Sequence, residues 1–84
     1  MPNIWTKGAI LQSVLLAKEK FNLNDAKRFM KYHNLPIIKI DETDKFYRFR
    51  QQSPDELYRK GYTKLRTKVI IPNYVEFIFA YHKL

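Results

Sequence analysis

Alternation of apolar and polar residues with a period of two dominates residues 36–52, and it restricts this part of the chain to β-structure. The clearest case is Lys45–Gln52, where successive side chains of an extended strand would point to opposite sides. The preceding Ile37–Ile40 is short and β-branched, and the polar residues 41–44 between the two segments are typical of a turn. We therefore expect a two-stranded hairpin over this region.

The two faces of the predicted strand Lys45–Gln52 differ in chemistry. One face carries Tyr47, Phe49 and Gln51 and is suited to a hydrophobic core. The opposite face carries Phe46, Arg48, Arg50 and Gln52. Two guanidinium groups would therefore lie on one side of the sheet, at the spacing of alternate strand residues.

Two segments before the hairpin have apolar residues at helical spacing. The first covers roughly Lys7–Lys20, and the second covers roughly Asp25–His33 with Asn24 as its N-cap. Asn34 can adopt the left-handed conformation that ends a helix, and Pro36 prevents its continuation. Two successive helices also permit a helix-turn-helix DNA-binding motif, but the second helix is short and strands follow at once, which disfavours that alternative.

A short helix and two further strands are predicted after the hairpin. The helix covers about Pro54–Lys60, with Ser53 as its cap and Gly61 at its end. Strands are expected at Tyr62–Ile71 and, after a turn at residues 72–73, at Tyr74–His82. The last segment has apolar residues on both faces, which is typical of a strand inside a sheet or under helices.

Together these elements predict one small α+β domain spanning residues 1–84. Two N-terminal helices are followed by an antiparallel sheet of about four strands with a short inserted helix. A chain of 84 residues with 45% hydrophobic and 15% aromatic residues can fill a modest core. The sequence has no cysteine, which excludes disulfides and thiolate chemistry and suits an intracellular protein.

The charge of the chain points to polyanionic partners. Sixteen Lys and Arg residues against eight Asp and Glu residues give a net charge of +8. In the predicted strand 62–71, alternate positions carry cations, as they do in Lys45–Gln52. If both strands present these cations on the same side, five of them form one surface beside an aromatic residue. The predicted nucleic-acid site consists of Arg48, Arg50, Lys64, Arg66, Lys68 and Phe46. The alternative is an ordinary solvated sheet face.

Catalytic and metal-binding patterns are weak. Asp41, Glu42 and Asp44 could suggest a metal-dependent nuclease, but acidic residues at a hairpin tip are more typical of a solvated turn. His33 and His82 have no ligand spacing around them. The two glycines form no phosphate-binding loop. We therefore expect a protein that is not an enzyme and has neither cofactor nor metal.

Residues 21–52 resemble a short module found in proteins of tailed phages and large DNA viruses. The matching residues are Ala26, Phe29, His33, Ile38, Lys39, Asp41, Thr43, Tyr47, Arg48, Phe49 and Arg50. The later Thr63, Lys64 and Leu65 fit the next strand of that module, whereas Pro72-Asn73 stands where the module has a glycine-containing turn. The resemblance implies a viral source and no particular activity.

Two functions from different classes remain open. The first is a non-enzymatic nucleic-acid-binding protein, with DNA more expected than RNA. The second is a viral structural or assembly protein that acts through protein contacts, including a possible homodimer through Leu16 on the predicted first helix. No apolar run reaches the length of about 20 residues that spans a bilayer, so we expect no membrane partner. The expected location is the host cytoplasm, the nucleus or the virion.

Overall fold

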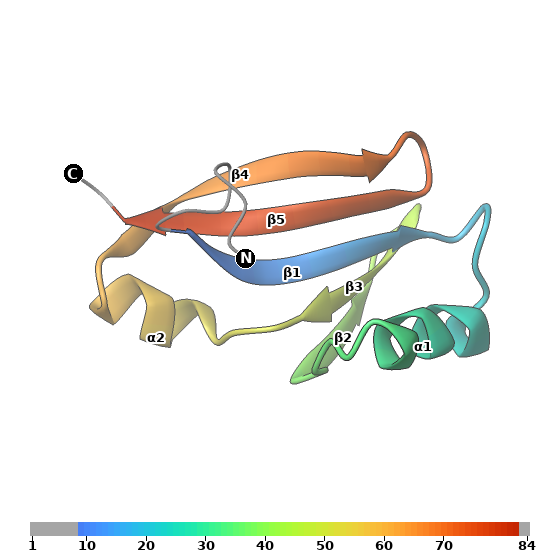
Figure 1. The fold of residues 1–84 in the computed structure, drawn as a ribbon, viewed down its shortest axis with the longest axis horizontal. Helices are drawn as coiled ribbons and strands as arrows, with labels where there is room; N and C mark the ends of the chain where they lie inside the picture. Colours follow the sequence, from blue (N-terminus) through green and yellow to red (C-terminus); the bar gives the residue numbers. More distant parts are fainter. Residues whose placement is uncertain (1–8, 83–84) are drawn as a thin grey trace.

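The computed structural model describes residues 9–82, which form five strands and two helices (Figure 1). The first two residues of the predicted N-terminal helix, 7 and 8, lie outside the described part. The elements in chain order are β1 (Ala9–Ala17), α1 (Leu23–Tyr32), β2 (Lys39–Glu42), β3 (Phe46–Arg50), α2 (Pro54–Arg59), β4 (Tyr62–Ile71) and β5 (Val75–His82).

All five strands belong to one antiparallel sheet with the order β2-β3-β1-β5-β4. Figure 1 shows β1 in the middle of this order, with β4 along one outer edge and β2 along the other. The first strand in the sequence is therefore the central strand of the sheet. Its neighbours come from the middle and the end of the described chain.

The predicted architecture of two N-terminal helices and a sheet of about four strands is wrong. The segment predicted as the first helix is strand β1, and the first helix follows it. A short apolar run such as AILQSVLLA satisfies both the spacing of a helix face and that of a central strand. Pairing on both sides makes β1 a central strand, where apolar residues on both faces are favourable. This arrangement also removes the helix pair that a helix-turn-helix motif needs.

A β-bulge explains how two polar residues fit into this central strand. The register between β1 and β5 shifts between Leu11 and Ser13, which places Gln12 at the irregularity. Gln12 and Ser13 are both buried, and the Ser13 hydroxyl donates a 2.6 Å hydrogen bond to Gln12 Oε1. The bulge therefore gives both polar side chains a place in the sheet.

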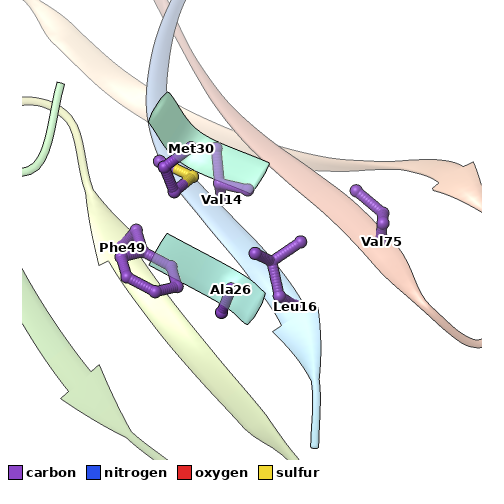
Figure 2. Close-up of a cluster of buried hydrophobic side chains, with 6 residues drawn as sticks. All are labelled: Val14, Leu16, Ala26, Met30, Phe49 and Val75. Carbon is purple, nitrogen blue, oxygen red and sulfur yellow. The ribbon is translucent and has the colours of Figure 1, made fainter. Parts of the chain in front are cut away.

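Helix α1 covers one face of the sheet, which we call the α1 face. The Asn22 side chain caps the helix by accepting a 2.8 Å hydrogen bond from the Asp25 backbone N–H, two residues before the predicted cap at Asn24. Asn34 follows with a φ of 55°, which confirms the predicted left-handed end. Figure 2 shows Ala26 and Met30 of α1 beside core residues of β1, β3 and β5. The fully buried cluster consists of Val14, Leu16, Ala26, Met30, Phe49 and Val75.

The position of Leu16 changes the interpretation of a possible dimer. Leu16 lies on β1 and is fully buried beneath α1, so it is not a residue of an exposed helix. A dimer through this residue is therefore incompatible with the fold. The structure assigns it to the core instead.

Helix α2 packs against the opposite side of the sheet, which we call the α2 face. Its Leu57 is buried, and an open cavity of about 260 Å³ separates the helix from Gln12, Arg48 and Leu65 of the sheet. Gly61 follows the helix with a φ of 92°, as the sequence predicted for the residue that ends it. Ser53 precedes the helix without a side-chain capping hydrogen bond.

The later strands agree most closely with the sequence-based expectation. β4 has the predicted bounds, and β5 begins one residue later than predicted and lies inside the sheet. The predicted hairpin at residues 36–52 exists and consists of β2 and β3. β2 lies two residues later in the chain than predicted, and β3 is shorter than predicted. Phe49 and Gln51 are buried, which confirms the predicted inner face of β3.

Candidate binding surfaces

The five cations of the predicted nucleic-acid site lie on opposite faces of the sheet. Directly paired residues of antiparallel strands share a face. Lys68 pairs with Phe77, and Phe77 pairs with the core residue Val14, so the cations of β4 belong to the α1 face. Arg48 pairs with Leu15, whose side chain points to the opposite side from Val14. The arginines of β3 therefore belong to the α2 face, and one five-cation surface does not form.

Arg48 is held inside a polar network on the α2 face. Its Nε donates a 3.2 Å hydrogen bond to Ser13 Oγ, and its Nη2 donates a 3.2 Å hydrogen bond to Gln12 Oε1. Because both acceptors are buried, the guanidinium gives hydrogen-bond partners to polar groups of the central strand. This role is structural, and its partners lie in the segment that the sequence pattern assigned to a helix.

Arg50 and Phe46 are also engaged within the fold. Arg50 Nη2 forms a 2.8 Å ion pair with Asp41 Oδ2 on the neighbouring strand β2. Lys39 adds a 3.5 Å ion pair to the same carboxylate. Phe46 is half-buried and pairs with the buried Ala17. The β3 part of the predicted site thus contributes mainly to the cohesion of the sheet.

The three cations of β4 form the remaining part of the predicted site. Lys64, Arg66 and Lys68 are exposed and share the α1 face of the edge strand. Alternate strand residues are about 6.6–6.8 Å apart, so the three charges form a row along the strand. Within residues 9–82, Lys64 and Arg66 form no ion pair. We call these three residues the cationic row.

The other side of β4 alternates threonine with large aliphatic residues. Leu65 and Val69 lie on the α2 face, with exposed fractions of 57% and 51%. Ile70 and Ile71 follow at the second irregularity of this strand, where Ile71 pairs with the core residue Val75 and so belongs to the α1 face, and both are also exposed. An exposed cluster of large aliphatic side chains on one strand is unusual for a free surface and is typical of an interaction site. The sequence showed the alternation, but it could not show that Leu65 and Val69 are exposed.

The backbone of β4 adds a third kind of group. Within residues 9–82, β4 is one of the two edge strands of the sheet and pairs only with β5. Alternate residues of such a strand direct their N–H and C=O groups away from the sheet. Every residue from Thr63 to Ile71 is exposed. β4 therefore presents cations, aliphatic side chains and outward-directed backbone groups along one strand.

Asp41, Glu42 and the two histidines contact neighbouring side chains within the fold. Asp41 forms ion pairs with two cations, and Glu42 forms a 2.8 Å ion pair with Lys18. His33 stacks against Phe29 with ring centroids 4.4 Å apart, and the His82 ring contacts Tyr62. Across residues 9–82 there is no group of three His, Asp or Glu residues placed to hold a metal ion. In the same part of the chain, no helix has the length and apolar character needed to cross a membrane.

A second cavity has mixed chemistry. It has a volume of about 420 Å³ and is open to solvent at the end of the sheet opposite α2. Its lining includes both signs of charge, with Lys18 and Lys45 near Glu19, Asp44 and Glu76. Such a crevice lacks the convergent polar groups in an apolar setting that mark most small-molecule sites.

Comparisons with known proteins do not identify a family. No protein-family model matches the chain, and neither the curated proteins nor the solved structures give a significant match. The resemblance of residues 21–52 to a viral module therefore stays a prediction. Inference about function rests on the surfaces described above.

Proposed function

We propose that this is a non-enzymatic protein-binding domain and that β4 is its binding element. The observation that carries the proposal is the exposure of nine consecutive residues of an edge strand, Thr63–Ile71, including four large aliphatic side chains. Protein interfaces combine an apolar centre with a charged rim. β4 offers both, with its aliphatic side next to the cationic row.

The distribution of the cations supports a protein partner over a nucleic acid as the first candidate. Arg48 and Arg50 hydrogen-bond within the sheet, so they are not directed at an external phosphate. Phosphate backbones are bound through cations and polar groups, and exposed Leu65 and Val69 would add little to such binding. An apolar segment of another protein would cover them.

A peptide-display selection tests the proposal and does not require that the natural partner be identified. A random library is selected against the immobilised protein and against the variant Leu65→Lys with Val69→Lys. The control is Ile37→Lys with Ile38→Lys, because these aliphatic residues are 40% and 59% exposed near the opposite edge. We expect peptides enriched on the wild type to bind the control variant as tightly as the wild type. The same peptides should not bind the β4 variant.

Circular dichroism of both variants establishes that they are folded. Peptides that bind the β4 variant as well as the wild type would remove β4 as the binding element. Failure to enrich any peptide on the folded wild type would count against a protein-binding function.

Nucleic-acid binding is the second candidate, and the net charge of +8 together with the cationic row favours it. With three phosphates contacted, the logarithm of affinity should fall with a slope of about −2.7 against the logarithm of salt concentration. That slope corresponds to a loss of about 40-fold between 50 and 200 mM salt. A row of five cations would give a slope of about −4.5.

Fluorescence anisotropy with duplex and single-stranded DNA measures this slope. The variant Lys64→Gln with Arg66→Gln is compared with Lys27→Gln with Lys31→Gln, which removes two exposed cations from α1. A larger loss for the β4 variant supports the cationic row as a phosphate site. Equal losses would show that only the net charge attracts the DNA. The viral source is a separate proposal that rests on the resemblance alone.

A further inference from the structure

We infer that β4 binds an extended segment of another protein in which acidic and apolar residues alternate, and that this segment joins the sheet as a sixth strand. The inference rests on the proposed protein-binding function and names the chemistry of the partner. Addition of a strand to an exposed sheet edge is a common mode of peptide recognition, in which backbone hydrogen bonds provide affinity and alternate side chains provide specificity.

The two edges of the sheet differ in a way that selects β4. β2 has four residues, of which Lys39, Asp41 and Glu42 are charged, and Lys39 forms an ion pair with Asp41. Short edge strands are protected against pairing with other chains, and in β2 opposite charges already pair within the strand. β4 has ten residues and therefore extends over about 33 Å. Its length is sufficient for several backbone hydrogen bonds to an added strand.

The side chains of β4 determine what an added strand should contain. Its residues on the α1 face would lie beside Lys64, Arg66 and Lys68, where Asp or Glu would form cross-strand ion pairs. Its residues on the α2 face would lie beside Leu65, Thr67 and Val69, where apolar residues would cover exposed aliphatic surface. The complementary partner is thus a strand with acids at every second position and apolar residues between them.

A second copy of this chain does not meet the requirement. Two β4 strands paired about a two-fold axis keep equivalent faces on the same side, so the cationic row would lie opposite another cationic row. Like charges directly opposite one another destabilise a strand pair. The cationic row therefore disfavours self-pairing and favours an acidic partner.

The test uses fluorescently labelled synthetic peptides and the full chain. The matched peptide has the sequence Val-Glu-Val-Glu-Val-Glu-Val with Gly-Ser at each end. Two controls are a peptide of the same composition with the three Glu residues together and a peptide with Lys in place of Glu. We expect the matched peptide to bind about tenfold more tightly than the first control and more tightly still than the second, because only it places an acid beside each cation.

Backbone methylation tests whether the peptide binds as a strand. One derivative carries N-methyl groups on the Glu residues and another carries them on the Val residues, so that each blocks one edge of the peptide. We expect one of the two to lose about tenfold or more in affinity, because an added strand needs the amides of one edge. We also expect slowed hydrogen exchange at alternate β4 amides. Equal binding by both derivatives would overturn strand addition.

Charge reversal tests the role of the cationic row. In the variant Lys64→Glu with Arg66→Glu, preference should switch from the Glu peptide to the Lys peptide, which a merely destabilised protein would not show. An unchanged preference would overturn the inference. Binding of an oligonucleotide but of no peptide would also overturn it, as would a dimer that excludes the matched peptide.

The two levels of the proposal can fail separately. Display could select peptides that require β4 but lack alternating acidic and apolar residues, and that bind with either methylation pattern. In that case the protein-binding function stands and strand addition is wrong. If no selected or synthetic peptide requires β4, both are wrong.

Discussion

Replacement of Arg48 by Met should destabilise the fold, although the sequence pattern suggests an arginine available for a ligand. Methionine keeps most of the unbranched aliphatic volume and removes the guanidinium. The change therefore isolates the two 3.2 Å hydrogen bonds to Ser13 Oγ and Gln12 Oε1. The matched control is Arg66→Met, which makes the same chemical change at an exposed position of β4.

The expected loss follows from the partners of Arg48. A hydrogen bond from a charged donor contributes about 1.5–3 kcal/mol to stability when buried, and Arg48 is only half-buried, so the lower value applies to each bond. Removal of the guanidinium also removes the cost of withdrawing it from water, which offsets part of the loss. The Ser13–Gln12 hydrogen bond persists and limits the number of unpaired groups. The net loss in the free energy of unfolding is about 2 kcal/mol.

Urea denaturation followed by far-ultraviolet circular dichroism measures this loss. With an m-value of about 1 kcal/mol/M, the Arg48→Met midpoint should fall by about 2 M. Arg66→Met should change the free energy by less than about 0.5 kcal/mol, as expected for a surface position. Equal midpoints for the two variants would refute a structural role for Arg48. Weaker DNA binding by a fully stable Arg48→Met protein would identify the guanidinium as a ligand-binding group.

Three further substitutions test other parts of the fold by the same denaturation assay. Gly61→Ala should lower the free energy of unfolding by more than about 1 kcal/mol, because the φ of 92° disfavours a side chain and the new Cβ would lie 2.7 Å from the His82 ring. An unchanged free energy would contradict the close packing there. Phe49→Ala should cost about 3–5 kcal/mol and leave little folded protein, since the ring is fully buried, and a loss under about 1 kcal/mol would show that the core does not depend on it. Asn34→Ala should cost about 1 kcal/mol while Asn34→Gly costs nothing, because φ is 55° at this position; similar losses for both would show that the backbone conformation is not the cause.

The sequence predicted those elements whose signals are local. Residues 63–69 of β4 alternate, and Gly61 and Asn34 mark chain reversals that only a few residue types adopt without strain. The inner face of β3 followed from the period of two, because Phe49 is buried while Arg48 lies on the other side. These features require only neighbouring residues, and one sequence contains that information.

The remaining features depend on pairings between distant parts of the chain. Val14 and Leu16 fit a helix face as well as a strand, and only the pairing of β1 with β3 and β5 decides between them. The same pairings determine which face of each strand meets α1. The sequence could therefore identify a cationic side on β3 and another on β4, but it could not show that the two are on opposite faces. For the same reason, the sequence could not show that the aliphatic residues of β4 are exposed.

The central position of β1 also affects how the chain acquires its structure during synthesis. Ala9 pairs with Tyr81, and Ser13 pairs with both Arg50 and Ile78, so the earliest strand needs partners that leave the ribosome much later. Contacts of such large sequence separation are associated with slow folding. Until β3 and then β5 emerge, the apolar run from Ala9 to Ala17 has neither of its neighbours and is open to non-native association.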